Sequence, residues 1–259
     1  MDKLIVQIND DEAMEVYTAE GNFYRSIATL AKEGVPIWTC DNLFLARIKG
    51  GPEHTVSTQW SWTAESFNHY PDGSIVVALR DCNPILKNTG KVTDYQINWE
   101  KYYLSKKIAD ELRERAEKDP EKARKSGALL LERKNTEPIP AEHLAEHPLG
   151  YFLSPNNAKP YGKLCQRAKI PAIPIYAAEK AKKPFSLALG VNDIILGSRS
   201  NLSGYYSLSY SSGRVHGALI VPSKQDAQKV LESLVEKCDG FIRYKGIIYV
   251  PKSETLTTK

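Results

Sequence analysis

Residues 55–63 read TVSTQWSWT, residues 70–73 read YPDG, and residues 74–80 read SIVVALR. Every second residue from Val56 to Trp62 falls on one face of an extended chain, and the polar residues between them fall on the other, which is the period of a β-strand. The Pro-Asp-Gly sequence is typical of a turn, and the β-branched run after it predicts a returning strand. Together these stretches predict two antiparallel strands joined by a tight turn.

The residues before this unit predict two further strands and one helix. Apolar runs predict strands over 3–8 and over 43–48. A helix over 22–33 is indicated by Asn22 as its N-cap, by an apolar stripe at helical spacing, and by Gly34 as its stop. The N-terminal part is therefore expected to mix helix with a substantial antiparallel sheet.

The middle of the chain predicts a charged helical arm over 98–134. Asn98 is a candidate cap for a first helix whose apolar stripe runs from Leu104 to Leu112. Asp119, followed directly by proline and glutamate, predicts the start of a second helix. The high charge density indicates that much of this arm faces water, where it is a candidate contact surface.

Residues 135–160 predict an irregular connection, because they contain five prolines. This connection would separate a mixed sheet domain with its helical arm, residues 1–134, from a basic α/β domain, residues 161–259. The alternative is one continuous domain through both halves.

The C-terminal part has the pattern of a hairpin, a helix and a final hairpin. Tyr and Leu alternate with Ser over 205–210, and an apolar run covers 215–221. Ser223 opens a capping-box pattern for a helix, and 241–250 predicts a last strand or tight hairpin. The whole chain is therefore expected to be an α+β (mixed α/β) protein with largely antiparallel sheets and covering helices.

Composition places the chain among ordinary globular proteins. Its 259 residues are 42% hydrophobic and 25% charged, which excludes a disordered or fibrous chain. The four cysteines lie far apart without a CxxC pair, so no structural zinc site is indicated. No apolar run is long enough to cross a bilayer. We expect a cytoplasmic protein with reduced thiols and no membrane partner.

Charge is distributed unevenly along the chain. Residues 1–150 carry 19 Lys and Arg against 24 Asp and Glu, a net charge of −5, whereas residues 151–259 carry 16 against 7, a net charge of +9. Such asymmetry favours a polyanion-binding half. The alternative is a solvated basic surface without a partner.

Basic and aromatic residues interleave along 159–214. Nucleic-acid binding uses this combination, because cations neutralise phosphates while aromatic rings stack on unpaired bases. We therefore predict that the C-terminal half binds the phosphates of DNA or RNA. The alternative is that the tyrosines pack in the core and the lysines face water. The residues predicted to make the contacts are Lys163, Arg167, Lys169, Arg199, Tyr205, Tyr206 and Arg214.

Residues 212–216 read SGRVH and lead into an apolar run. This stretch resembles the S-G-x-x-H run of primase-polymerase proteins, and the resemblance implies that His216 contacts a nucleotide phosphate. Those proteins also carry paired upstream carboxylates for metal ions, a pair that this sequence lacks; a hairpin turn is the alternative. If the protein is a DNA- or RNA-processing enzyme such as a nuclease, His216, Glu65 and Tyr70 are the candidate catalytic residues, and a divalent metal is a candidate cofactor.

Two other functions remain open from the sequence. One is a non-enzymatic interaction protein that forms homo-oligomers through the helical arm 98–134 as its contact surface. The other is a zinc hydrolase, because residues 143–147 read HLAEH, the H-x-x-E-H pattern. On a helix, His143 and His147 would share one face and bind one zinc ion, while Glu146 would act as the base.

Overall fold

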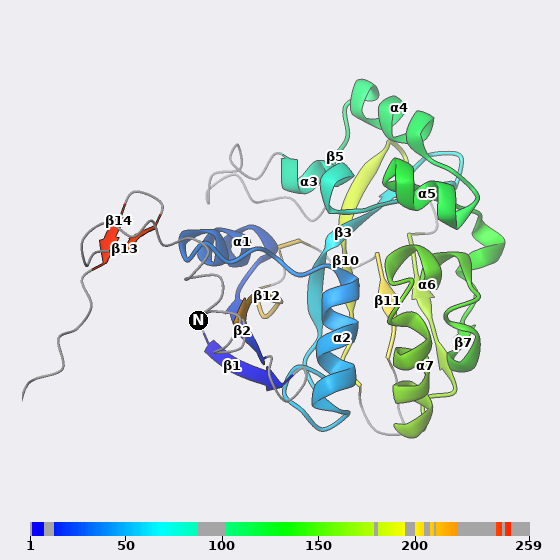
Figure 1. The fold of residues 1–259 in the computed structure, drawn as a ribbon. Helices are drawn as coiled ribbons and strands as arrows, with labels where there is room; N and C mark the ends of the chain where they lie inside the picture. Colours follow the sequence, from blue (N-terminus) through cyan, green and yellow to red (C-terminus); the bar gives the residue numbers. More distant parts are fainter. Residues whose placement is uncertain are drawn as a thin grey trace, which may run out of the picture.

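The computed structural model describes residues 2–7, 13–87, 102–178, 181–194, 200–204, 208–209, 211–221, 242–244 and 247–249. These residues form a ten-stranded sheet with helices packed against it (Figure 1). The architecture confirms the predicted α+β class, because all but two of the strand pairings described are antiparallel.

The strands of the large sheet are β1 (Asp2–Gln7), β2 (Ala13–Glu20), β3 (Ser61–His69), β4 (Ile75–Ala78), β5 (Tyr102–Tyr103), β6 (Ala128–Leu131), β9 (Ile175–Tyr176), β10 (Phe185–Val191), β11 (Leu202–Ser203) and β12 (Arg214–Val221). Their order is β1-β2-β12-β3-β10-β11-β9, with β4 beside β3, β6 beside β4, and β5 beside β10. The two parallel pairs are β12 with β3 and β11 with β9. Two short sheets pair β7 (Ile139–Pro140) with β8 (Ala172–Ile173) and β13 (Ile242–Tyr244) with β14 (Ile247–Tyr249).

The described helices are α1 (Phe23–Lys32), α2 (Cys40–Gly50), α3 (Pro84–Lys87), α4 (Lys106–Arg115), α5 (Pro120–Ser126), α6 (Pro148–Leu153) and α7 (Ala158–Arg167). Short 3-10 turns lie at Arg80–Cys82, Arg133–Thr136 and Ala141–His143. None of the helices in the described part of the chain has the length and apolar character needed to cross a bilayer.

The predicted strand–turn–strand unit is present as β3 and β4, joined by the turn at 70–73. The first strand begins at Ser61 rather than at Thr55, and residues 52–58 form turns instead. All nine residues of β3 are buried. The alternation of apolar and polar residues therefore does not separate a buried face from a solvated one, because other elements cover both faces of this central strand. Val56 and Trp62 accordingly belong to two different clusters of the core.

Residues 43–48, expected as a strand, lie inside helix α2. The cause is a capping box just before them: the Asn42 N–H donates to Thr39 Oγ1 at 3.3 Å, and the Thr39 N–H donates to Asn42 Oδ1 at 3.1 Å. The box satisfies backbone donors that a helix start leaves unpaired. Leu43, Phe44 and Arg47 then fall on the buried side of the helix.

Two of the predicted helix starts are confirmed, and one is not. Asn22 caps α1 and Asp119 caps α5, each by accepting backbone N–H donors. The first helix of the arm, α4, is capped by Ser105 rather than by Asn98, which lies outside the described residues. The arm is also not helical to its end, since residues 128–131 form strand β6 beside β4.

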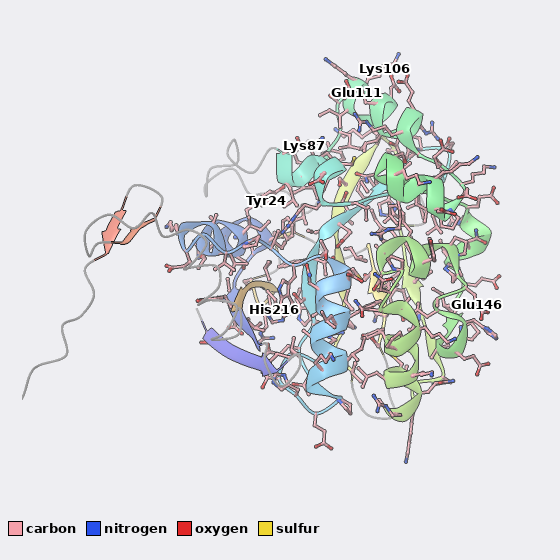
Figure 2. All side chains as sticks on the ribbon, in the orientation of Figure 1. Tyr24, Lys87, Lys106, Glu111, Glu146 and His216 are labelled. Atoms are coloured by element: carbon pink, nitrogen blue, oxygen red, sulfur yellow. The ribbon has the colours of Figure 1, made fainter. Side chains whose placement is uncertain are left out.

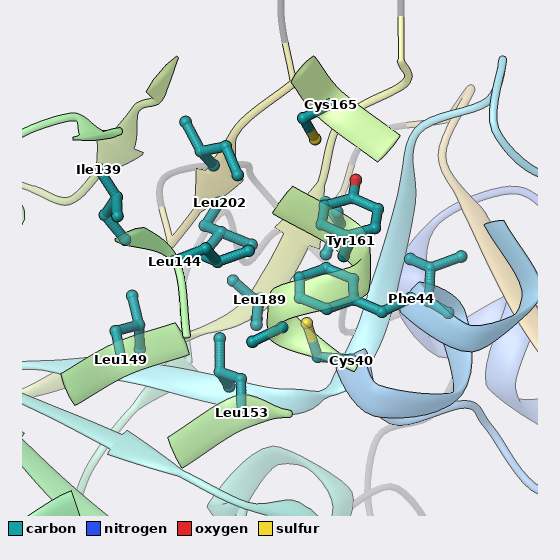
Figure 3. Close-up of a cluster of buried hydrophobic side chains, with 14 of the residues drawn as sticks. Cys40, Phe44, Ile139, Leu144, Leu149, Leu153, Tyr161, Cys165, Leu189 and Leu202 are labelled. Carbon is teal, nitrogen blue, oxygen red and sulfur yellow. The ribbon is translucent and has the colours of Figure 1, made fainter. Parts of the chain in front are cut away.

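The largest cluster of buried residues lies where α2, α6 and α7 pack together and against the sheet (Figure 3). The rings of Phe44 on α2 and Tyr161 on α7 stack at 3.8 Å between centroids with 4° between planes. The 135–160 stretch, predicted to be an irregular connection, contains α6 and the start of α7. Residues from both sides of this stretch contribute to the cluster. Strands from both sides also share the large sheet, as β3 and β10 do.

Arg47 of α2 lies at the centre of this packing with no solvent exposure. Its guanidinium donates hydrogen bonds to four carbonyl oxygens and to the Tyr161 hydroxyl, at 2.6 to 3.4 Å. The carbonyls belong to Val56, Gln59, Val191 and Asn192. One buried cation therefore joins α2, α7, the 56–59 turn and the end of β10, and its many donors satisfy acceptors that would otherwise be unpaired.

The C-terminal predictions are confirmed in part: the strand after the turn and the final hairpin are present, but the strand pairs with β2 and β3 rather than with residues 205–210. Residues 211–212 form a turn, and β12 follows as the expected strand. The final hairpin is present as β13 and β14. The predicted helix after Ser223 and most of the predicted strand over 205–210 lie outside the described residues, although Leu208 and Ser209 lie in a turn.

Candidate functional site

The three candidate catalytic residues, Tyr70, Glu65 and His216, are all buried, and each contacts a different part of the fold. Tyr70 is 2% exposed, and its hydroxyl donates to the Ala109 carbonyl of α4 at 2.9 Å. The Arg113 guanidinium lies 4.3 Å from the centre of the same ring. Burial raises the pKa of Tyr70 to about 12, against the opposing charge of Arg113. Tyr70 thus anchors α4 to the turn after β3.

Glu65 lies on β3 and is 1% exposed. Its carboxylate accepts a hydrogen bond from the Cys40 N–H, in the first turn of α2, at 2.9 Å. Burial raises the pKa of Glu65 to about 7, although hydrogen bonds from Thr63 and Cys40 oppose the rise. The carboxyl group is therefore positioned to hold the start of α2 against the sheet.

His216 lies on β12 with no solvent exposure. Its Nδ1 is 2.9 Å from Thr18 Oγ1 on β2, and its ring centroid is 5.6 Å from that of Trp38. Burial, together with the charges of Arg47 and Arg214, lowers the pKa of His216 to about 3. The ring is thus neutral near pH 7 and enclosed, which is unlike the phosphate-contacting histidine that the S-G-x-x-H resemblance implied. Figure 2 labels His216 on β12.

Three of the predicted phosphate-binding residues gather at the end of α7. Lys163 and Arg167 line a surface hollow of about 480 Å³, together with Ile48, Pro160 and Gln166. Lys169 lies two residues after the end of α7 and is exposed, with a φ of 59°. We call Lys163, Arg167 and Lys169 the α7 basic group.

Arg214, a fourth predicted contact, is part of a separate region. Its guanidinium pairs with the Glu20 carboxylate at 2.5 Å. It lies on β12, which packs against β2, β3 and α1, whereas α7 packs against α2, α6 and the 141–143 turn. Arg199, Tyr205 and Tyr206 lie outside the described residues. The predicted phosphate contacts that the structure describes therefore lie in two separate regions rather than one.

The H-x-x-E-H pattern is not on one helix. Residues 141–143 form a 3-10 turn, and α6 begins only at Pro148. His147 is the N-cap of α6, and its Nδ1 accepts the Leu149 N–H at 3.2 Å. His143 is exposed and lies 2.8 Å from the Glu146 carboxylate. The expectation of two histidines on one helical face is wrong, because Pro148 starts a helix here instead of following one.

Metal ligands do not gather elsewhere in the described part of the chain. Within those residues, no group of three His, Cys, Asp or Glu side chains is placed to hold a metal ion. The divalent metal expected for a nuclease therefore has no ligand set among the residues that the structure describes.

Residues 204–213, which include the predicted phosphate contacts Tyr205 and Tyr206, connect β11 to β12, and the structure describes 204, 208–209 and 211–213 of them. Backbone hydrogen bonds hold this segment at three points. The Gly204 N–H donates to the Tyr176 carbonyl at 2.8 Å, and the N–H groups of Phe23 and Gly21 donate to the carbonyls of Leu208 and Gly213 at 3.0 and 2.9 Å. The segment is thus tied to β9 at its start and to α1 and its preceding turn further along.

Inside the segment, some positions are fixed by packing and others face solvent. Leu208 is fully buried in the cluster that contains Phe23 and Trp62. A Cβ added at Gly213 would lie 2.0 Å from the Trp62 ring, and one at Gly204 would lie 2.4 Å from Phe67. Only glycine fits such close approaches. Ser209, Ser211 and Ser212 are exposed.

Two exposed tyrosines flank the start of the segment. Tyr176 is 49% exposed and Tyr103 is 42% exposed. Tyr103 pairs with Phe185, whose ring stacks on His69 at 4.8 Å, and His69 Nε2 lies 3.0 Å from the Gly204 carbonyl. The Lys183 ammonium lies 3.9 Å from the centre of the Tyr103 ring. We call the described residues of this segment (204, 208–209 and 211–213), together with Tyr103 and Tyr176, the tyrosine surface.

No protein-family model matches the chain, and no curated protein matches it either. Among solved structures, the chain is similar to one described as the accommodation of massive sequence variation in Nanoarchaeota by the C-type lectin fold. The two share 15% sequence identity with a TM-score of 0.59, and the match covers 82% of this chain and 100% of that one. The likeness defines the fold: this is an α+β protein with a C-type lectin-like fold.

Proposed function

We propose that this protein recognises a partner macromolecule through the tyrosine surface. The observation that carries the proposal is that residues 204–213 include both packed positions and exposed positions. Backbone hydrogen bonds and close packing fix Gly204, Leu208 and Gly213, and Ser209, Ser211 and Ser212 face solvent. A segment fixed in this way can present side chains for binding without contributing them to the core.

The composition of the segment supports the same proposal. Residues 204–213 read GYYSLSYSSG and contain three Tyr, four Ser and two Gly. Antibody binding loops are enriched in these residues, because Tyr supplies a large contact area at low conformational cost while Ser and Gly adapt their hydrogen bonding. Tyr103 and Tyr176 contribute two exposed aromatic side chains to the proposed surface.

The similar solved structure offers a second line of support. It is described as accommodating massive sequence variation on a C-type lectin fold. On this chain, the corresponding property would be tolerance of substitution at the exposed positions of the tyrosine surface, with the scaffold unchanged. A recognition function would follow from such tolerance, since partner choice could change without loss of folding.

A library of random peptides displayed on phage is expected to yield binders to the immobilised protein that engage the tyrosine surface. Changing Tyr205, Tyr206 and Tyr210 together to Ser should weaken these binders at least about tenfold, because tyrosines carry a large share of interface energy. Affinities measured by biolayer interferometry test this.

The matched control is Tyr151→Ser, which removes one tyrosine from α6 outside this surface and should leave the affinities unchanged. Binders that keep full affinity for the triple variant would show that the tyrosine surface is not the recognition site.

We propose nucleic-acid binding at the α7 basic group as a second candidate function. Lys163 and Arg167 line the same hollow, and Lys169 continues the group. Fluorescence anisotropy with single- and double-stranded DNA and RNA across a salt series tests it. For a single strand, Lys163→Gln with Arg167→Gln should reduce the slope of log affinity against log salt by about 1.4, or 0.7 per lost phosphate contact. Absence of binding by the unchanged protein at low salt would exclude this candidate.

The helical arm stays a predicted contact surface. One side of α4 and α5 packs inward through Ala109, Leu112 and Ala123. The outward side carries ion pairs of Lys107 with Glu111 and of Lys125 with Glu121.

A further inference from the structure

Four exposed lysines gather where β5 pairs with β10 and α4 begins. One pair forms the start of α4, which Figure 2 marks at Lys106, and the other pair lies just before β10. The Leu104 N–H donates to the Pro184 carbonyl at 3.0 Å, so the two chain segments that carry these lysines lie side by side. We call Lys106, Lys107, Lys182 and Lys183 the lysine patch.

The lysine patch adjoins the tyrosine surface through Tyr103. The Lys183 ammonium lies 3.9 Å from the centre of the Tyr103 ring. Tyr103 itself pairs with Phe185, the first residue of β10. Exposed positive charge and exposed aromatic area are therefore in direct contact at this edge of the large sheet.

The carboxylates of the described residues leave most of this charge unneutralised. Among those residues, only Glu111 has a carboxylate within 4.0 Å of a patch lysine, Lys107, and both of these side chains are more than half exposed. The first turn of α4 contains no acidic residue, so the acids of this helix begin at Asp110. A surface that gathers charge of one sign attracts groups of the opposite sign.

The chemistry of the lysine patch favours carboxylates over nucleic acid. Binding of an unpaired base needs a free aromatic face, whereas the Lys183 ammonium lies over the Tyr103 ring. The patch contains no arginine, the residue whose planar group matches phosphate with two parallel hydrogen bonds. Lysine ammoniums are compact charges, each of which can pair with a single carboxylate.

We propose that the partner of the tyrosine surface is an acidic peptide segment, whose Asp and Glu side chains bind the lysine patch beside Tyr103. This inference rests on the recognition function proposed above and adds the charge of the partner. A single exposed ion pair contributes little to affinity, so several carboxylates must engage the patch together. Their attraction also steers the partner onto the adjoining tyrosines.

Fluorescence anisotropy tests this with three labelled probes: a peptide that alternates Glu with Gly, the same peptide with Gln in place of Glu, and a thymidine oligonucleotide. At low salt, the Glu peptide should bind at least about tenfold more tightly than the Gln peptide, because several weak ion pairs act together. Lys106→Gln with Lys183→Gln should weaken binding of the Glu peptide about fivefold. Added salt should reduce both differences.

The matched control is Lys122→Gln with Lys125→Gln, which removes two exposed charges of the same sign from α5 and should leave the affinity unchanged. Equal binding of the Glu and Gln peptides, or equal losses in the two double variants, would overturn the proposal. An oligonucleotide that binds more tightly than the Glu peptide, and loses affinity only when the lysine patch is changed, would also overturn it.

The recognition function itself is judged by a different result. Phage-selected peptides that depend on the tyrosines but show no preference for acidic residues would leave the recognition function standing while they overturn the acidic partner. Binding of the Glu peptide through the lysine patch, with phage-selected peptides indifferent to the tyrosines, would show the reverse.

Discussion

Arg47→Met is expected to lower the free energy of unfolding by about 3–5 kcal/mol, since each buried acceptor left without a donor costs about 1–3 kcal/mol. The guanidinium satisfies the carbonyls of Val56, Gln59 and Asn192 and the Tyr161 hydroxyl, and no water reaches it. Methionine fills much of the volume but donates no hydrogen bond. Urea denaturation followed by circular dichroism measures the loss.

Arg47→Lys should recover only a small part of this stability, because a lysine ammonium cannot copy the planar arrangement of five donors. Arg167→Met on the exposed side of α7 is the matched control, with an expected change within about 0.5 kcal/mol. A loss of less than about 1 kcal/mol for Arg47→Met would show that Arg47 does not hold these elements together.

Acid is expected to destabilise the protein through His216. The folded-state pKa is lowered from 6.5 to about 3, chiefly by burial. Below pH 6.5 the His216 side chain binds a proton in the unfolded chain but not in the native state. The contribution of neutral His216 to the free energy of unfolding is therefore complete above pH 6.5 and is lost as the pH falls towards 3. Each pH unit in that window removes about 1.4 kcal/mol.

The measurement is the free energy of unfolding between pH 4 and pH 8 for the natural chain and for His216→Gln. The variant should show a shallower fall below pH 6.5, whatever its absolute stability, because glutamine does not titrate. The other titrating groups are common to both proteins and cancel in the difference. Parallel curves would contradict the buried, neutral state of His216.

Local patterns predicted those elements whose signals are local. Asn22 and Asp119 start helices because side-chain caps act within one turn, and the turn at 70–73 depends on its own residues. The alternation over 55–63 misled because burial on both faces of β3 depends on α2 and on other distant elements. The apolar pattern of residues 43–48 suits a strand and a helix equally well, and the capping box at Thr39 makes this stretch helical.

The candidate site was harder to predict, because it depends on contacts between distant parts of the chain. Charge counting placed Arg214 with Lys163, but an ion pair with Glu20 and a different position in the sheet separate them. Tyr103 and Tyr176 are 73 positions apart in the sequence, and they belong to the same sheet only through the pairing of β5 with β10, β10 with β11 and β11 with β9. The Tyr, Ser and Gly content of 204–213 is the sequence signal that could have indicated this surface. The alternation within the same stretch predicted a strand instead.

The most direct test of the recognition proposal is a scan of all substitutions over 204–213 with two measurements: the amount of folded protein displayed on the yeast surface, and binding to the selected peptides. Substitutions at Gly204, Leu208 and Gly213 should abolish folding, because these positions are packed. Substitutions at Ser209, Ser211 and Ser212 should keep folding and change binding. The account would be contradicted if substitutions at the exposed serines prevented folding as often as substitutions at Gly213, or if none of the serine substitutions changed binding.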